Sequence, residues 1–232
     1  MRSPQKVISP RRKVLAMWLG ALRRGLRPWR ALSTRAWLSC WSCGLSLPPS
    51  GAPCRFCPSC RALQPPEPQQ DLFSVMGCER RFRLDASHLR QTFRALQGRL
   101  HPDRFSHKPQ VERGFSEEHS SLVNKAYRTL LDPLSRGIYL LELNGVSLEQ
   151  GTDPGSDPEF LLEIMEANER LQDPQCKMAD LERELAAKRE ELMESLGRAF
   201  DAGDLLEAKS LLTKMKYFSN LEEKLKEKKA PP

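Results

Sequence analysis

The sequence lacks features that define several large classes of protein. No apolar run approaches the roughly 20 residues that a membrane-spanning helix requires, so no membrane contact is predicted. From Asp71 onward there is little of the apolar–polar alternation that marks strands, which argues against a β-rich fold. No Ser, Cys or second carboxylate is placed to form a relay with His101, so no enzymatic activity is predicted.

Acidic residues are absent from the first quarter of the chain. Residues 1–66 hold 12 Lys/Arg and no Asp or Glu, and the first acid is Glu67. After residue 66 there remain 25 of the 37 Lys/Arg against 30 Asp/Glu, a net charge of −5. The basic character of the chain therefore belongs to its N-terminal quarter, and we expect no nucleic-acid partner for the body.

Residues 1–36 are typical of a mitochondrial transit peptide. They contain ten Lys/Arg, interleaved with apolar residues such as Trp18, Leu22 and Trp29. An Arg-rich, Ser-containing and acid-free segment predicts import into the mitochondrial matrix. A disordered basic tail and a secretory signal built on Val14–Leu22 are the alternatives, and a cytoplasmic fraction is left open.

Residues 37–61 contain paired cysteines at the spacing of a metal site. Cys40 and Cys43 form one C-x2-C pair, and Cys57 and Cys60 form another. Two such pairs can direct four thiolates to one point, which predicts a single structural zinc ion. Cys54 and Cys57 also form a C-x2-C pair, so Cys54 competes with Cys60 as a ligand. A disulfide pair and a redox-active C-x2-C are the other interpretations.

The rest of the chain predicts an all-α fold. The Pro/Gln-rich segment 62–70 is expected to be an extended linker that insulates the cysteine module from the helical body. Apolar residues at helical spacing then predict a helical hairpin and, further on, a three-helix bundle. The expected boundaries are 71–144 for the unit with the hairpin, 145–157 for a second linker, 158–228 for the bundle and 229–232 for a tail.

A rigid turn interrupts the predicted hairpin at His101, Pro102 and Asp103. Pro102 disfavours helical geometry at His101 and stiffens the turn. Asp103 is thereby available to accept hydrogen bonds from an Arg of a partner. Arg90 and Arg94 lie on the exposed face of the preceding helix. A turn that merely contains these residues is the alternative, since a tripeptide is a weak signal on its own.

The arrangement as a whole resembles the HscB family of J-domain co-chaperones. The His-Pro-Asp turn between antiparallel helices carries the resemblance, together with "DLFSVMG", "LSRGIYLLELNG", "KMKYFSNLEEKL" and the paired cysteines before them. The resemblance implies that the turn, Arg90 and Arg94 dock on a mitochondrial DnaK-type chaperone and stimulate its ATP hydrolysis. It also implies delivery of an IscU-type iron–sulfur scaffold, with recipient iron–sulfur proteins as further partners.

The resemblance places scaffold binding on the C-terminal bundle. The matching positions are Leu161, Leu162, Met165, Glu166, Glu169 and Tyr217. The periodicity alone favours burial of the apolar members in the bundle core. Three rival functions remain: a zinc-knuckle nucleic-acid-binding protein, a thiol oxidoreductase, and a J-protein with a different client.

Overall fold

The structure is a computed structural model that describes residues 39–47, 54–68, 70–148, 157–173, 175 and 177–229. The predicted transit peptide, residues 149–156 of the predicted second linker and residues 230–232 of the predicted tail lie outside the described residues. The expected all-α class is confirmed. The helices are α1 (Leu72–Met76), α2 (Ala86–Leu100), the 3-10 helix η2 (Pro102–Phe105), α3 (Gln110–Leu131), α4 (Pro133–Leu143), α5 (Pro158–Gln172), α6 (Met178–Ala202) and α7 (Leu205–Lys229).

Local sequence signals set most of the helix ends. Five helices begin at an aspartate whose side chain accepts hydrogen bonds from the first free backbone amides, as an N-cap does. These caps are Asp71, Asp85, Asp132, Asp157 and Asp204. Gly77 ends α1 and Gly203 ends α6 in the left-handed conformation that glycine adopts without strain. None of the helices in the described ranges combines the length and the apolar content needed to cross a membrane.

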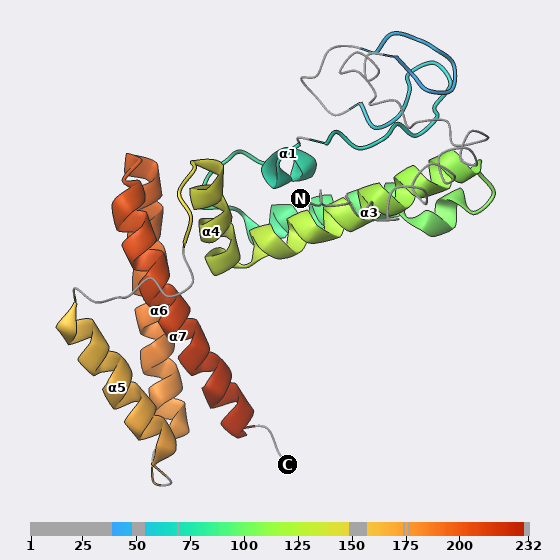
Figure 1. Cartoon of the computed structure of the whole chain (residues 1–232). Coiled ribbons are helices and arrows are strands. Elements are labelled where there is room, and N and C mark those ends of the chain that lie inside the picture. Colours follow the sequence, from blue (N-terminus) through green and yellow to red (C-terminus); the bar gives the residue numbers. More distant parts are fainter. Residues whose placement is uncertain are drawn as a thin grey trace, which may run out of the picture.

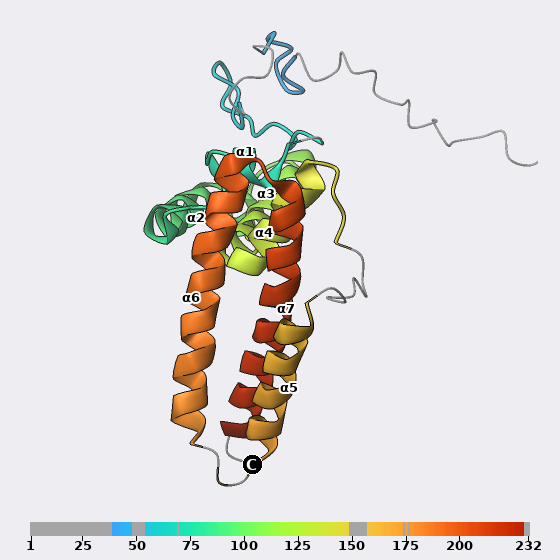
Figure 2. The same cartoon turned by 90° about the vertical axis from the view of Figure 1, so that its left-hand side faces the viewer.

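Helices α1–α4 share one hydrophobic core with the tip of the α6–α7 hairpin. Phe82, after α1, stacks on Phe200 of α6 with ring centroids 5.4 Å apart. Leu212 of α7 is fully buried against Gly137 of α4, where an added Cβ would lie 2.5 Å from Cδ2 of Leu212. Figure 2 shows α1–α4 seated on the upper ends of α6 and α7. The hairpin is thus firmly attached to the α1–α4 unit.

The other half of the α6–α7 hairpin forms the predicted three-helix bundle with α5 (Figures 1 and 2). Its core is a second, separate cluster of buried apolar residues. Helix α5 contributes every third or fourth residue to that cluster, the spacing of one helical face. The α5 members are Phe160, Ile164, Ala167 and Leu171.

The expectation that residues 62–70 insulate the cysteine module is wrong at the start of that segment. Leu63 is 0% exposed and belongs to the core of the α1–α4 unit. Its backbone N–H donates to the buried Oε1 of Glu112 on α3 at 2.9 Å, and Nε2 of His119 donates to the carbonyl of Gln64 at 2.9 Å. A module this small cannot form a hydrophobic core of its own, so it packs into the core to which α3 belongs.

Candidate functional site

The two cysteine pairs fold into matching backbone turns, which we call knuckles. In each, the amide of the first cysteine donates to the carbonyl five residues later. The amide four residues later donates back to the carbonyl of that cysteine. The bonds run from Cys40 to Leu45 and from Gly44 to Cys40 in the first knuckle, and from Cys57 to Ala62 and from Arg61 to Cys57 in the second, at 2.8 to 2.9 Å.

The knuckles bring four thiol groups to one point. The Sγ atoms of Cys40, Cys43, Cys57 and Cys60 all lie within 4.8 Å of one another. Two of the Sγ–Sγ distances, Cys40–Cys60 and Cys43–Cys57, are 3.6 Å. A tetrahedral ion with metal–sulfur bonds of about 2.3 Å would space its ligands by about 3.8 Å. The Cys54 thiol instead donates to the carbonyl of Phe56 at 3.2 Å. The predicted ligand set is therefore the one that the structure assembles, and it can hold a metal ion.

Two thiols of the cluster, those of Cys40 and Cys43, have pKa values shifted in opposite directions. Burial raises the pKa of Cys40, but hydrogen bonds from the backbone of Cys43 and Ser42 and from the Cys60 thiol outweigh it and lower that pKa to about 6. A backbone hydrogen bond from Leu45 lowers the pKa of Cys43, but burial and the neighbouring thiols raise it to about 11. Four thiolates this close repel one another, and a bound cation would relieve that repulsion.

The knuckles differ at the residue after the second cysteine. Gly44 has a φ of 75° in the first knuckle, and Arg61 has a φ of 58° in the second. Glycine adopts this left-handed conformation freely, whereas other residues lose roughly 1–2 kcal/mol in it. Arg61 is the only non-glycine residue with a positive φ among the residues that the structure describes. The left-handed conformation of Arg61 therefore costs the second knuckle conformational free energy that a glycine would not.

The His-Pro-Asp turn lies at the end of α2, as the sequence predicts. His101 ends the helix with extended backbone, and Pro102 opens η2. Phe105, 6% exposed, anchors the turn in the core. Nδ1 of His101 accepts a hydrogen bond from the backbone N–H of Asp103 at 3.3 Å. The side chain of Asp103 is 89% exposed, so its carboxylate is presented to solvent on an ordered backbone.

Arg90 and Arg94 are one turn apart on the exposed face of α2. Neither has an ion-pair partner within the described part of the chain. Arg80, Arg81 and Arg83 differ, because each forms an ion pair with a carboxylate of this chain. Of these basic residues, only the pair on α2 is free to meet a partner.

Helix α5 exposes an apolar face that the bundle leaves uncovered. Leu161 is 36% exposed, Leu162 58% and Met165 57%. Glu166 and Glu169 are exposed on the same helix. The periodicity alone favoured core positions for the apolar residues, and that interpretation is wrong, because a different face of α5 packs inward. Their exposure makes them available to a partner.

Tyr217 of α7 is half-buried beside α5. Its ring meets the ring of Phe160 edge to face, with centroids 5.8 Å apart. Tyr217 therefore supports the position of α5 through Phe160.

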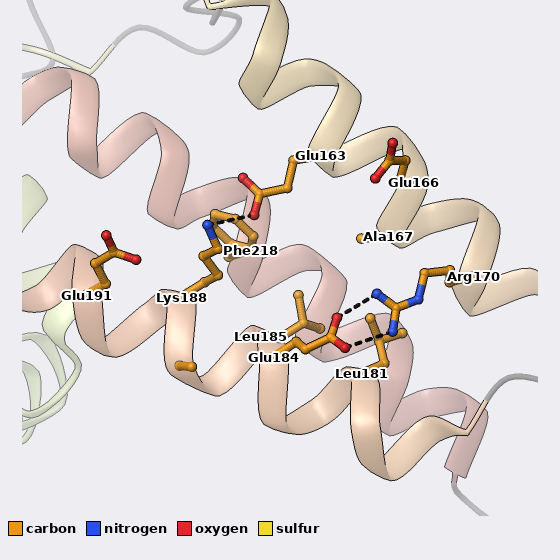
Figure 3. Close-up of a pocket in the computed structure, with 11 residues that line it drawn as sticks. Glu163, Glu166, Ala167, Arg170, Leu181, Glu184, Leu185, Lys188, Glu191 and Phe218 are labelled. Carbon is orange, nitrogen blue, oxygen red and sulfur yellow. Dashed lines mark hydrogen bonds and ion pairs between the residues drawn. The ribbon is translucent and has the colours of Figure 1, made fainter.

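A cleft of about 380 Å³ separates α5 from α6 (Figure 3). Leu181, Leu185 and Phe218 are among the apolar residues that line it. Ion pairs cross it from α5 to α6: Arg170 contacts Glu184 with two N–O distances of 2.5 and 3.1 Å, and Lys188 contacts Glu163 at 3.1 Å. The ion pairs join α5 to α6 across a gap that apolar packing leaves open.

Sequence reasoning missed how the cysteine module meets the turn. The rings of Trp41 and Phe115 pack edge to face at 6.0 Å, and Arg99 lies over the ring of Phe56 at 5.4 Å. Arg99 was visible as a basic residue near the turn, but nothing in the sequence pairs it with a residue 43 positions earlier.

Together these features define a class: an all-helical binding protein with a four-cysteine metal-binding centre. A family model described as the HSCB C-terminal oligomerisation domain matches residues 156–226. The iron-sulfur cluster co-chaperone protein HscB of Mus musculus is 50% identical over 194 residues, 83% of each chain. The chain therefore belongs to the HscB family of iron–sulfur cluster co-chaperones.

Solved structures agree with this assignment. The crystal structure of human co-chaperone protein HscB is 48% identical and superposes with a TM-score of 0.79, covering 84% of this chain and 100% of that one. Chaperone HscB from Vibrio cholerae is 31% identical with a TM-score of 0.62, covering 68% of this chain and 96% of that one. The expected family is confirmed, and with it the expectation of a co-chaperone that is not an enzyme.

Proposed function

We propose that this chain joins a mitochondrial DnaK-type chaperone to an IscU-type iron–sulfur scaffold through two separate surfaces. The observation that carries the proposal is the placement of those surfaces on opposite parts of the fold. The turn at His101–Asp103 belongs to the α1–α4 unit, and the apolar face of α5 belongs to the bundle (Figure 1). One protein can then hold both partners at once.

The chaperone surface consists of the turn and the basic face of α2. Asp103 is exposed and held by the short η2 helix, so its carboxylate is ready to accept two hydrogen bonds from an arginine. Arg90 and Arg94, on the helix that leads to the turn, have no ion-pair partner among the described residues, and their positive charge attracts an acidic surface. Docking there stimulates ATP hydrolysis by the chaperone. The boundaries 71–144 for a J-domain belong to this proposal.

The scaffold surface consists of Leu161, Leu162, Met165, Glu166, Glu169 and Tyr217. Exposed apolar residues ringed by polar ones are typical of protein interfaces. The two glutamates add specificity for a basic rim on the scaffold. The bundle over residues 158–228 then delivers the scaffold for cluster transfer to recipient iron–sulfur proteins.

The metal centre holds one structural zinc ion in this proposal. Four thiolates fill a tetrahedral shell and leave no position for substrate, and zinc favours such a shell. The ion would fix the fold of the two knuckles. The basic leader over residues 1–36 supports the mitochondrial matrix as the location, with a cytoplasmic fraction as a second pool.

The test is stimulation of the purified mitochondrial DnaK-type chaperone. Asp103→Asn and His101→Gln are expected to abolish stimulation, because each removes a group of the turn, while the helical circular dichroism stays unchanged. Glu117→Gln, on the exposed surface of α3, is the matched control and should stimulate as the unmodified protein does. Normal stimulation by Asp103→Asn would refute the proposal.

A further inference from the structure

A second cleft lies between the second knuckle and the turn that follows α2. Its volume is about 450 Å³. It draws residues from three separate segments, which the fold brings together. The residues that matter are Phe56, Arg61, Arg99, Arg104, Lys108 and Glu112.

The cleft is lined by four cations and a single carboxylate, an excess of three positive charges. Its one carboxylate, Glu112, is 5% exposed and already accepts a hydrogen bond from the backbone N–H of Leu63. Within the described ranges, none of the four cations forms an ion pair. Arg104 donates only to the carbonyl of Gly98. Uncompensated like charges in one concave site create a strong positive potential, which an anionic ligand relieves.

The backbone of the second knuckle gives an independent indication. The residue after its second cysteine is Arg61, in the left-handed conformation that Gly44 adopts in the first knuckle. Glycine there would satisfy the fold of the knuckle. Residues in sparsely populated backbone conformations cluster at functional sites, and the side chain of Arg61 lines this cleft.

The chemistry of the lining suits carboxylates. Three of the four cations are arginines, whose planar guanidinium groups bind a carboxylate through two parallel hydrogen bonds. Arg99 is stacked over the ring of Phe56, so its position is set before any ligand arrives. The site is small and local, while the chain after residue 66 has a net charge of −5, which disfavours a long polyphosphate strand.

We propose that this cleft binds an acidic peptide segment of the DnaK-type chaperone, so that the metal module forms part of the docking surface. The inference rests on the proposed function, since it takes that chaperone as the partner. Position supports the choice: Arg99 and Arg104 flank the turn at His101–Asp103 in the chain. A chaperone seated on the turn brings its neighbouring surface to the cleft.

The experiment measures the affinity of the full chain for the purified mitochondrial DnaK-type chaperone by calorimetry. Arg61→Gly is expected to weaken binding about threefold, and so is Lys108→Gln, with the double variant near tenfold. The salt dependence of binding should fall in the same variants. Lys125→Gln, an exposed cation farther along α3, is the matched control and should bind unchanged.

Metal content separates binding from folding. Arg61→Gly should keep its full metal content, because glycine relaxes the knuckle, and Lys108→Gln lies outside the module altogether. Unchanged affinity in the double variant would overturn the inference even if Asp103→Asn abolishes stimulation. If Asp103→Asn still stimulates, the proposed function itself fails.

A direct probe identifies the ligand chemistry. A hexaglutamate peptide should bind the unmodified chain and lose affinity in the double variant. Binding of a single-stranded RNA of equal charge more tightly than that peptide would overturn the assignment in favour of nucleic acid.

Discussion

The two ends of the molecule are stabilised in different ways. The cysteine module buries few apolar side chains beyond Cys40, Cys57 and Leu63, and it is held by backbone hydrogen bonds, by four clustered thiols and by contacts with α3. The bundle has its own apolar cluster of nine buried residues and needs no metal. We therefore expect the module to depend on a bound ion and on its contacts with α3, whereas the bundle depends on packing.

The same two ends carry opposite surfaces. The end with the module and the turn presents unpaired cations, and the bundle presents exposed apolar residues beside glutamates. Such surfaces favour partners of different surface chemistry. In the proposed function, recognition is therefore distributed along the chain, with the α6–α7 hairpin connecting the two ends. A substitution at one end can therefore be judged with the other end as its reference.

The largest effect is expected at the metal centre. Cys57→Ser removes one of the four ligands, so the metal content should fall from about one ion per chain to none. Cys54→Ser should keep the ion, because the Cys54 thiol lies outside the cluster. Metal analysis of the purified variants checks this. If Cys54→Ser lost the ion and Cys57→Ser kept it, Cys54 would be a ligand in place of Cys57.

Loss of the ion should reach α3 but spare the bundle. If the knuckles unfold, Glu112 and His119 lose the hydrogen bonds that they form with Leu63 and Gln64. Hydrogen exchange after strong chelation should therefore rise in residues 39–47 and 54–64 and at the start of α3, with α5 unchanged. Equal protection of the module before and after chelation would show that it folds without metal.

A smaller effect is expected where the two ends join. A methyl group at position 137 would lie 2.5 Å from Cδ2 of Leu212, which is fully buried. Gly137→Ala should cost about 1–3 kcal/mol of unfolding free energy, the usual range for overpacking.

Gly197→Ala is the matched control for that substitution. Its methyl group would meet the guanidinium of Arg83, whose half-exposed side chain can move away. Its cost should stay below about 1 kcal/mol, since alanine also favours the helix. Urea denaturation of both variants gives the comparison. Equal costs would mean that α4 and α7 are not tightly packed.

The smallest effects are expected from pH. Burial lowers the pKa of His119. Below about pH 6.5 the unfolded chain binds a proton that the folded His119 resists, so stability should fall as the pH drops from about 7 to about 5. His119→Gln should flatten that window. Thermal melts across the range check this, and an unchanged slope would show that His119 is protonated in the fold.

Asp71 should give a second pH range, below the first, in which stability also falls as the pH falls. Burial alone would raise its pKa, but hydrogen bonds from Arg80 and Ser74 lower it to about 2. Its contribution is present above the unfolded value of about 3.9 and should be lost as the pH falls toward 2. Asp71→Asn should remove that loss, which thermal melts between about pH 5 and 2 would detect.

Local chemistry made most of the fold predictable. Aspartates before helices, Pro102 after His101 and the spacing of the cysteine pairs each act within a few residues. The contacts that join distant segments were not predictable in this way. The buried hydrogen bond from Leu63 to Glu112 spans 49 residues, and the exposed face of α5 is set by which of two apolar stripes packs against α7. Arg61 was identified as a candidate residue only from its positive backbone φ, which the sequence does not give.

The most direct test of the two-surface account measures both activities on two variants. Leu161→Ala and Met165→Ala together should weaken binding of the IscU-type scaffold at least tenfold, about 1.4 kcal/mol, and leave stimulation of the chaperone by the scaffold-free protein intact. Asp103→Asn should do the opposite. The account predicts this reciprocal pattern, with the melting temperature of both variants within a few degrees of the unmodified protein. Loss of both activities in either variant, or a large fall in melting temperature without a specific loss of affinity, would contradict it.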